Sequence, residues 1–483
     1  MIRFNRHVTM LTATAMLAGC TATGGASAGD GGTRADQNRL VLTIVTGEGF
    51  PAEAEEFANA VAEVSGGSIE VKVDNQSANG DGVPDYEARV INYVADRKAE
   101  LGFVAARAFD TVGVDAFQPL HAPFLIDNYE LEAQVLRSAS AEALLEGTRP
   151  GGVVGIGYVQ GPLRRPLGYS RAFLDLADYE GARIGVRGSS LIERTIEALG
   201  ATPVVFPPGD TTGLDGMEVH VSQIDLGKYD FGADSLTGNV VLWPRPGVIF
   251  ANADVFDALT SDQQAILREA GRRNLDASIA GMPGFEEGFL HGPCQRGLAI
   301  KMAPDGAVDR LRAAVQPVYA AIERDAGAKA VLEEIEALRA SVNAPPEAVE
   351  CTSSAATPLP SHTVIDSPIV GSWTVSITQE EFQASPLIYD AGERNDPGNW
   401  GDFTLTFTAD GRVTLDNPSA SESTSGTYAI DGDHVVMEYT QGYNRGERFG
   451  GRWSIFRDTL TFERVPPQVL PTTYLVKAWT RSP

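Results

Sequence analysis

Alternating hydrophobic and polar positions divide the chain into two parts with different expected secondary structure. In the first part, strand-like runs such as RLVLTIVT and SIEVKV alternate with helical patterns such as PAEAEEFANAVAEVSGG. That helical pattern has a proline near its start and two glycines past its end, which commonly bound helices. The alternation of strands and helices predicts α/β units on a mainly parallel sheet.

After residue 365 the pattern becomes entirely β. Runs such as DFTLTFTADGRVTLD and SGTYAIDGDHVVMEY alternate apolar with polar positions, which is the period of half-buried strands. Asp410-Gly411 and Asp431-Gly432 are strong signals for two-residue hairpins. About eight short strands of this kind predict a small all-β meander barrel.

The N-terminus has the layout of an export signal. Arg3 and Arg6 precede an apolar run from about residue 8 to 18, and the sequence LAGC ends at Cys20. The apolar run is shorter than the roughly 20 residues that a membrane-spanning helix needs. LAGC resembles a bacterial lipobox, so we expect lipidation of Cys20; a plain signal peptide with a chance cysteine is the alternative.

Low-complexity segments mark the domain boundaries. Residues 21–38 are mostly Gly, Ala, Ser and Thr, which is typical of a flexible tether, and Ser, Thr and Pro are frequent from 351 to 363. We therefore expect a lipoprotein signal peptide at 1–20, a tether at 21–38, an α/β domain at 39–350, a linker at 351–365 and a β-barrel at 366–483.

Charge and cysteine content narrow the possible partners. The formal net charge of −26 argues against binding to nucleic acid or to anionic membrane surfaces, which attract basic proteins. Cys294 and Cys351 are predicted to form one disulfide in an oxidising compartment, with two free thiols as the alternative. Neither cysteine has a partner at C-x-x-C spacing and the six histidines are scattered, so we expect no metal site.

The α/β part resembles the solute-binding proteins of tripartite ATP-independent periplasmic (TRAP) transporters. The segments that carry the resemblance occur in the family's order between about residues 39 and 340: PLHAPFLIDNYELEAQVL, DLADYEGARIGVR, IEALGATPV, LDGMEV and LTSDQQAILREAG. The resemblance implies a two-lobed, type-two periplasmic-binding fold with the ligand between the lobes. It also implies delivery of a small organic acid to a membrane permease, commonly through an arginine that pairs with the carboxylate.

The arginines of this sequence depart from the family pattern. The ligand-binding arginine of the family falls on Gly185, whereas an earlier arginine of the family falls on Arg165. We expect Arg165 to contact the ligand; a surface arginine beside Arg164 is the alternative. Either Arg187, two residues beyond Gly185 on the same strand face, takes over the anion contact, or Gly185 opens the pocket for a bulkier or less acidic solute.

Three further residues are candidates for the ligand site. Arg107 follows a predicted strand directly, and ligands of α/β sheets bind at the carboxyl ends of strands. The alternative for Arg107 is a salt bridge, for example with Asp110. Phe109 and Phe206 are candidates for apolar walls of the cleft, although buried aromatic residues are more often part of the core.

Signatures of catalysis are missing from the sequence. It contains no H-E-x-x-H, and its one match to the G-x-S-x-G nucleophile motif, Gly25 to Gly29, falls in the expected tether and not between a strand and a helix, so we assign no catalytic residue and expect no cofactor. Our hypothesis is a lipid-anchored, extracytoplasmic receptor of a TRAP-type transporter, with an organic solute, a permease and the bilayer as partners. The alternatives are a ligand-sensing lipoprotein without a transport role, an envelope hydrolase and a structural surface protein.

The β-part resembles the lipocalin-like calycin barrels. These proteins have a G-x-W motif on the first strand, here Gly371 to Trp373, and a late arginine that closes over the tryptophan, here Arg481. A cation over an indole ring is favourable by about 0.5–2 kcal/mol. A barrel of eight strands is either filled by its own side chains or holds one small ligand, and the sequence leaves both possibilities open.

Overall fold

The computed structural model describes most of the chain beyond residue 38. The described residues are 39–46, 51–74, 86–206, 210–342, 344–351, 366–383, 385, 397–417, 423–441, 448–463 and 472–482. The expected signal peptide, Cys20 and the tether lie outside the described residues, as do residues 352–365 of the expected linker. No helix in the described ranges is long and apolar enough to cross a membrane.

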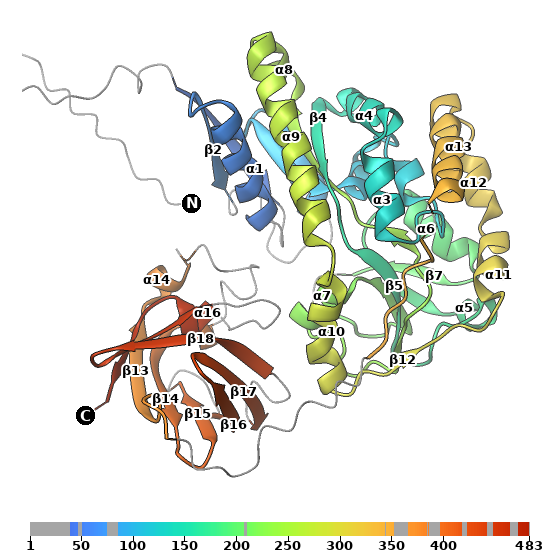
Figure 1. Ribbon diagram of the computed structural model, residues 1–483. Helices are drawn as coiled ribbons and strands as arrows, with labels where there is room; N and C mark the ends of the chain where they lie inside the picture. The colour runs from blue at the N-terminus through green and yellow to red at the C-terminus, as the bar shows by residue number, and fades with distance from the viewer. Residues whose placement is uncertain are drawn as a thin grey trace, which may run out of the picture. The chain divides into compact units, whose positions relative to one another are not determined.

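The first lobe is built on a five-stranded sheet (Figure 1). Its strands, in spatial order, are β2 (Ile69–Asp74), β1 (Leu40–Thr46), β3 (Leu101–Ala105), β11 (Gly247–Asn252) and β4 (Val153–Val159). Strands β2, β1 and β3 run parallel, whereas β11 is antiparallel to both of its neighbours. Strands β2, β1, β3 and β4 therefore all run in one direction, which agrees with the expectation of a mainly parallel sheet. Strand β11 is the exception, because it returns from the second lobe and enters between β3 and β4.

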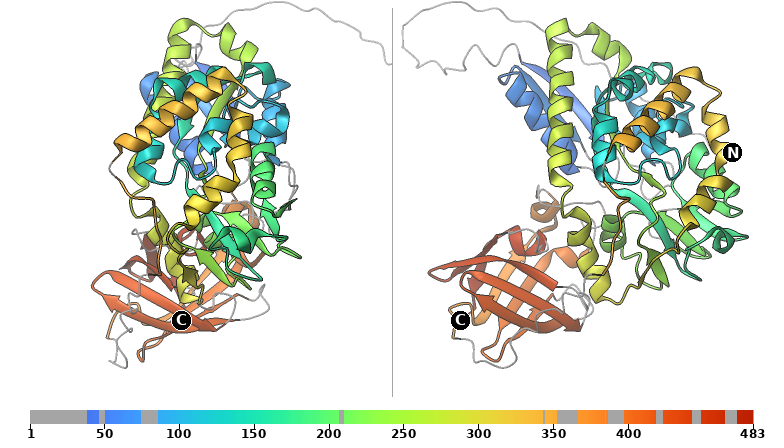
Figure 2. Two further views of the ribbon diagram at one scale, coloured as in Figure 1. Left: turned by 90° about the vertical axis from the view of Figure 1, so that its right-hand side faces the viewer. Right: turned by 45° about the vertical axis from the view of Figure 1, so that its right-hand side comes forward.

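Helices cover this sheet. They are α1 (Pro51–Val64), α2 (Tyr86–Ala95), α3 (Tyr129–Leu136), α4 (Ala139–Glu146), α8 (Ala253–Ala258) and α9 (Ser261–Gly281), with 3₁₀-helices η2 (Ala106–Val112), η3 (Gln118–His121) and η4 (Arg149–Gly151). The long helix α9 begins with a capping box, in which the Thr260 side chain and Gln263 satisfy each other's backbone amides. Helix α9 packs against α1 and β4 (Figure 2).

The second lobe contains the other mixed sheet. Its order is β12 (Ile300–Lys301), β9 (Ser235–Thr237), β5 (Leu163–Gly168), β8 (Gly216–Val219), β6 (Arg183–Val186) and β7 (Thr202–Val205), and β10 (Trp243–Pro244) also pairs with β5. The associated helices are α5 (Leu176–Tyr179), α6 (Ser190–Ala198), α7 (Val221–Leu226) and α10 (Phe285–Gln295). Three further helices follow: α11 (Ala307–Ala314), α12 (Gln316–Ile322) and α13 (Ala326–Ser341).

Residues 344–351 form a strap that crosses from the first lobe to the second. The Glu347 amide donates to the Asp127 carbonyl of the first lobe at 2.7 Å, and the Val349 amide donates to the Gly238 carbonyl of the second at 3.1 Å. The strap ends at Cys351, which forms the expected disulfide with Cys294 of α10. Cys351, the first residue of the expected linker, is thus covalently fixed to the second lobe.

The C-terminal part is a closed antiparallel barrel, as expected. Its strands are β13 (Gly371–Ile377), β14 (Gly401–Phe407), β15 (Arg412–Asp416), β16 (Thr424–Asp431), β17 (His434–Gln441), β18 (Arg448–Phe456), β19 (Thr459–Glu463) and β20 (Trp479–Arg481), with helices α14 (Gln379–Gln383) and α16 (Thr472–Leu475) and the 3₁₀-helix η5 (Pro397–Asn399). Aromatic and aliphatic side chains from the strands and from α14 and α16 form a buried cluster. The described interior is therefore packed as a hydrophobic core.

The predicted closure of the barrel is present. Trp373 is fully buried, and its indole nitrogen donates to the Ile369 carbonyl at 2.7 Å. The Arg481 guanidinium lies 4.5 Å from the centre of the Trp373 ring, and the two residues face each other across β13 and β20. The cation–π contact thus joins the first strand of the barrel to the last.

Candidate functional site

A cluster of buried arginines lies where the two lobes meet. Arg107 is in η2 of the first lobe, Arg164 in β5 of the second, Arg187 directly after β6, and Arg245 between β10 and β11. The four residues are between 1% and 8% exposed. Arg107, Arg187 and Arg245 all act on the pKa of Arg164, which shows that the four guanidinium groups share one electrostatic environment. We call these four residues the arginine cluster.

Two buried carboxylates hold the cluster together. Glu87 of α2 forms ion pairs with Arg107 and, at 3.8 Å, with Arg245. Burial alone would raise the pKa of Glu87, but the positive charges of Arg107 and Arg245 outweigh it and hold this pKa below its usual value.

Glu218 of β8 plays the corresponding part in the second lobe. One of its oxygens pairs with Arg164, and the other accepts a hydrogen bond from the Arg187 amide at 3.0 Å. Glu218 therefore fixes both the side chain of one cluster arginine and the backbone of another.

The cluster concentrates positive charge in a buried place. Among the described residues, the ion pairs of its guanidinium groups are with two carboxylates, Glu87 and Glu218. A third carboxyl group, Glu53, approaches Arg245, but burial raises its pKa, which favours the neutral form. Burial also lowers the pKa of Arg164, and the other three arginines lower it further. A buried site of this kind is stabilised by an anion.

Two donor atoms of the cluster have no hydrogen-bond partner within the described structure. They are Nη1 of Arg187 and Nε of Arg107, and both are buried. Buried donors in native proteins are nearly always paired, so these two atoms mark the place where an acceptor is needed.

Gly185 and Phe206 support Arg187. A Cβ atom at Gly185 would lie 2.6 Å from Leu214 Cδ1 and 2.9 Å from Phe206 Cε1, so these side chains fill the space beside the glycine. The Phe206 ring in turn lies under the guanidinium of Arg187, with 4.9 Å between the ring centre and Cζ. Gly185 thus makes room for the ring on which Arg187 rests; the space beside it is not open.

Arg165 lies outside the cluster. It is adjacent to Arg164 on β5, and neighbouring residues of a strand point to opposite faces of the sheet. Its guanidinium forms a two-pronged ion pair with Glu286 of α10 and also donates to the Gly238 carbonyl at 3.3 Å. Because Glu286 and Gly238 already accept the hydrogen bonds of this fully buried guanidinium, Arg164 replaces Arg165 as our candidate for the ligand contact.

Phe109 belongs to the core of the first lobe. It is fully buried, and its ring meets those of Phe117 and Phe250 edge to face, at 5.1 and 5.3 Å between ring centres. We therefore no longer consider Phe109 a candidate for a wall of the cleft. Arg183, the first residue of β6, is exposed and donates to the Gly213 carbonyl.

The segments that follow β1, β2 and Phe206, residues 47–50, 75–85 and 207–209, lie outside the described residues.

A pocket of about 530 Å³ lies between α12, α13 and the strap, away from the arginine cluster, and none of the cluster arginines lines it. Its Asp127 accepts hydrogen bonds from Arg312 and Arg339. Among the described residues, no group of three or more His, Cys, Asp or Glu side chains is placed to hold a metal ion.

Comparison with known proteins identifies the family. Residues 49–325 match the family model described as bacterial extracellular solute-binding protein, family 7. The chain belongs to this family. Its members are receptors for solutes outside the cytoplasm, and the resemblance noted in the sequence is confirmed.

Solved structures of TRAP periplasmic solute-binding proteins share the fold. One, from Bradyrhizobium sp. BTAi1, is a complex with galacturonate; it is 20% identical, with a TM-score of 0.55, and the match covers 61% of this chain and 99% of that one. Another, from Roseobacter denitrificans, contains β-D-glucuronate; it is 20% identical, with a TM-score of 0.54 and coverage of 62% and 99%. A sugar acid binding protein from Advenella mimigardefordensis, in complex with galactonate, is 20% identical, with a TM-score of 0.54 and coverage of 63% and 99%.

Sequence reasoning missed four members of the site. Arg164 was treated only as the neighbour of Arg165, and Arg245, Glu87 and Glu218 were not singled out. A signal was present for Arg164, because only one residue of an adjacent pair in a strand faces the cleft. No local pattern points to Arg245, since its position depends on the contact between the β10–β11 connection and Gly161, where a Cβ atom would lie 1.7 Å from the Arg245 carbonyl oxygen.

Proposed function

We propose that this protein is the extracytoplasmic receptor of a TRAP-type transporter and that it binds a small, carboxylate-bearing solute at the arginine cluster. The observation that carries the proposal is the pair of buried guanidinium donors, on Arg187 and Arg107, that have no hydrogen-bond partner among the described residues. A guanidinium group offers a planar pair of donors that a carboxylate accepts in two parallel hydrogen bonds. An anion would therefore satisfy the unpartnered donors.

The relatives support an acidic ligand. The three solved proteins described above contain galacturonate, glucuronate and galactonate, each of which has one carboxylate. The family's arginine position is Gly185 in this chain, and we propose that Arg187 and Arg164 provide the anion contact from neighbouring positions, with Arg107 closing from the first lobe. Phe206 serves as the platform for Arg187.

A thermal-shift screen of organic acids, followed by calorimetry, tests the proposal. A ligand that binds only the folded state raises the midpoint of unfolding with its concentration. Arg187→Ala and Arg164→Ala should weaken the binding of an acid found in this way by about tenfold to a hundredfold, because each removes a charge-assisted hydrogen bond. Arg183→Ala is the matched control, since this exposed arginine at the start of β6 should leave the affinity unchanged.

Two results would contradict the proposal. One is a screen in which neutral sugars stabilise the protein and organic acids do not. The other is an acid whose affinity is the same for Arg187→Ala, Arg164→Ala and the wild type. Turnover of a bound compound would instead favour the envelope hydrolase.

We also propose that the mature protein is anchored by lipid on Cys20. The support is the sequence LAGC after a short apolar run, followed by a segment with the composition of a flexible tether. Mass spectrometry of the N-terminal peptide from the membrane fraction tests this proposal. Diacylglycerol on Cys20 is the expected result, and an unmodified cysteine or cleavage at another position would refute it.

A further inference from the structure

We propose that Asp110 is a positioning residue for the ligand site. Its hydrogen bonds hold the turn after Arg187 and thereby set the spacing between Arg187 and Arg107. The inference rests on the proposed function, because it assumes that the anion is bound by these two arginines. Asp110 itself is not expected to touch the ligand. It was considered from the sequence only as a salt-bridge partner for Arg107, and the structure gives it different partners.

The 3₁₀-helix η2 places Arg107 and Asp110 on one side. A 3₁₀-helix has three residues per turn, so residues three apart lie above one another. Both side chains contact the turn that follows β6 in the second lobe. Arg107 Nη1 donates to the Gly188 carbonyl at 3.1 Å, directly after Arg187.

Asp110 holds the next three residues of the same turn. One carboxylate oxygen accepts from Ser189 Oγ at 2.8 Å and from the Leu191 amide at 2.9 Å. The other accepts from Ser190 Oγ at 2.8 Å. Within the first lobe, Gln118 donates a side-chain hydrogen bond of 3.2 Å to Asp110, and the Asp115 carboxyl group also interacts with it.

The charge of Asp110 also suits its position at the start of α6. Amide groups in the first turn of a helix point outward and carry partial positive charge, which favours an anion there. Burial raises the pKa of Asp110, but the hydrogen bonds from Leu191, Ser189 and Ser190 outweigh this effect and leave the pKa below its ordinary value. Asp110 is therefore charged at neutral pH.

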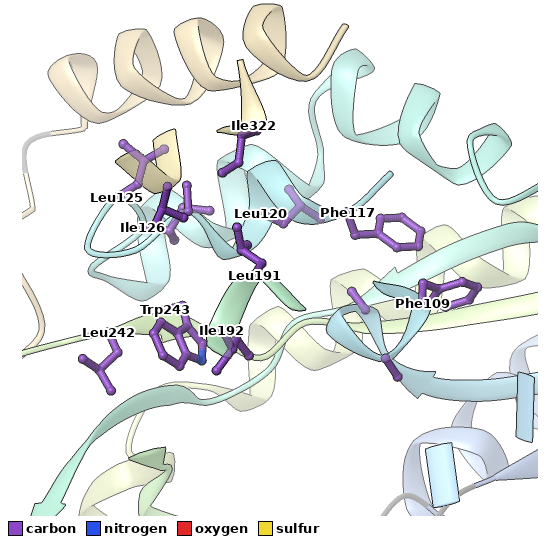
Figure 3. Close-up of a cluster of buried hydrophobic side chains, with 14 of the residues drawn as sticks. Phe109, Phe117, Leu120, Leu125, Ile126, Leu191, Ile192, Leu242, Trp243 and Ile322 are labelled. Carbon is purple, nitrogen blue, oxygen red and sulfur yellow. The ribbon is translucent and has the colours of Figure 1, made fainter. Parts of the chain in front are cut away.

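Apolar packing continues the contact beyond Asp110. Leu191 and Ile192 of α6 are fully buried in a cluster that also contains Leu120 and Ile126 of the first lobe (Figure 3). Asp110 thus lies at the border between this apolar contact and the arginine cluster. Arg187 directly precedes the turn that Asp110 holds. Loss of Asp110 therefore frees the backbone that orients the Arg187 guanidinium.

A double-mutant cycle on the full chain tests the inference, with galacturonate, glucuronate and galactonate as probes in calorimetry. Asp110→Ala should weaken binding about tenfold or more in the wild type. It should have little further effect in an Arg187→Ala background, because the effect of Asp110 passes through that arginine. A role that is merely structural would give the same loss in both backgrounds.

Asp325→Ala is the matched control, because Asp325 caps α13 through the Ala328 amide at 2.8 Å in the same way but does not join the two lobes. Ser190→Ala, which removes one of the three contacts from the second lobe, should reproduce part of the Asp110→Ala effect if the latter variant folds poorly. Equal affinities of Asp110→Ala, Ser190→Ala and the wild type would overturn the inference. Unchanged binding in Arg187→Ala would instead count against the proposed function.

A second measurement needs no ligand. Spin labels on exposed Glu63 of α1 and Glu197 of α6, attached through a non-natural amino acid so that the cysteines stay intact, report the distance between the two lobes. Asp110→Ala should broaden the distance distribution, whereas Asp325→Ala should leave it unchanged. A distance distribution for Asp110→Ala that matches the wild type would refute the proposal that Asp110 holds the two lobes at a fixed spacing.

Discussion

Replacing Gly185 by alanine places a methyl group in space that Phe206 and Leu214 already occupy. The new Cβ would lie 2.6 Å from Leu214 Cδ1 and 2.9 Å from Phe206 Cε1, well inside van der Waals contact. The Phe206 ring has little room to retreat, because the Arg187 guanidinium lies on it at 4.9 Å. Overpacking of this kind typically costs about 1–3 kcal/mol.

The same substitution should weaken ligand binding. A displaced ring no longer supports Arg187, and a contact between a cation and an aromatic ring is worth about 0.5–2 kcal/mol. The expected loss of affinity for an organic acid is therefore about threefold to thirtyfold. Urea unfolding measures the change in stability, and calorimetry measures the change in affinity.

A second background and a control variant test whether the cost comes from the contacts of the new methyl group. Gly185→Ala should cost less stability in a Phe206→Leu background, because the smaller side chain removes the contact with the ring and leaves only the contact with Leu214. Gly288→Ala in α10 is the control, since no atom lies within 4 Å of its new Cβ and alanine favours helix by up to about 1 kcal/mol. A Gly185→Ala protein with wild-type stability and affinity would refute the packing argument, as would an equal cost in both backgrounds.

Three further predictions concern other parts of the molecule. Glu132 is fully buried, and burial raises its pKa to about 8. Between about pH 4.5 and pH 8 the folded protein therefore keeps a proton that the unfolded chain releases, so the stability of the wild type should fall as the pH rises through this range. Urea unfolding should show a much smaller fall for Glu132→Gln. Removal of the disulfide by Cys294→Ala with Cys351→Ala should cost about 4 kcal/mol in the chain-entropy model, measured in the same way. Arg481→Ala should destabilise the barrel by about 0.5–2 kcal/mol, seen as a lower unfolding midpoint in tryptophan fluorescence, since four of the five tryptophans belong to the barrel.

Each of these has its own control or contrary result. Glu130→Gln, on the exposed side of the same helix, should keep the wild-type pH dependence, and a Glu132→Gln protein that also keeps it would contradict the assignment. Reducing agent should destabilise the wild type but not the double cysteine variant. Arg481→Lys should retain more stability than Arg481→Ala, since it keeps a cation above the ring; equal losses would argue against the cation–π contact.

The sequence predicted features that depend on neighbouring residues or on short motifs. The strand–helix order, the disulfide and the contact of Trp373 with Arg481 are all present. It could not predict which of Arg164 and Arg165 faces the other arginines, because the phase of β5 depends on the strands beside it. Arg245 joins the cluster through a close backbone contact with Gly161, and contacts between distant segments leave no local pattern.

The disulfide at the end of the strap determines how the protein responds to mechanical load. Tension applied through the barrel reaches the solute-binding domain first at Cys351, where a covalent bond passes it to Cys294 and α10. The hydrogen bonds of Val349 and Glu347 are therefore shielded from being pulled apart one after another. An oxidising environment thus lets the barrel be pulled without peeling the strap from the two lobes that it connects.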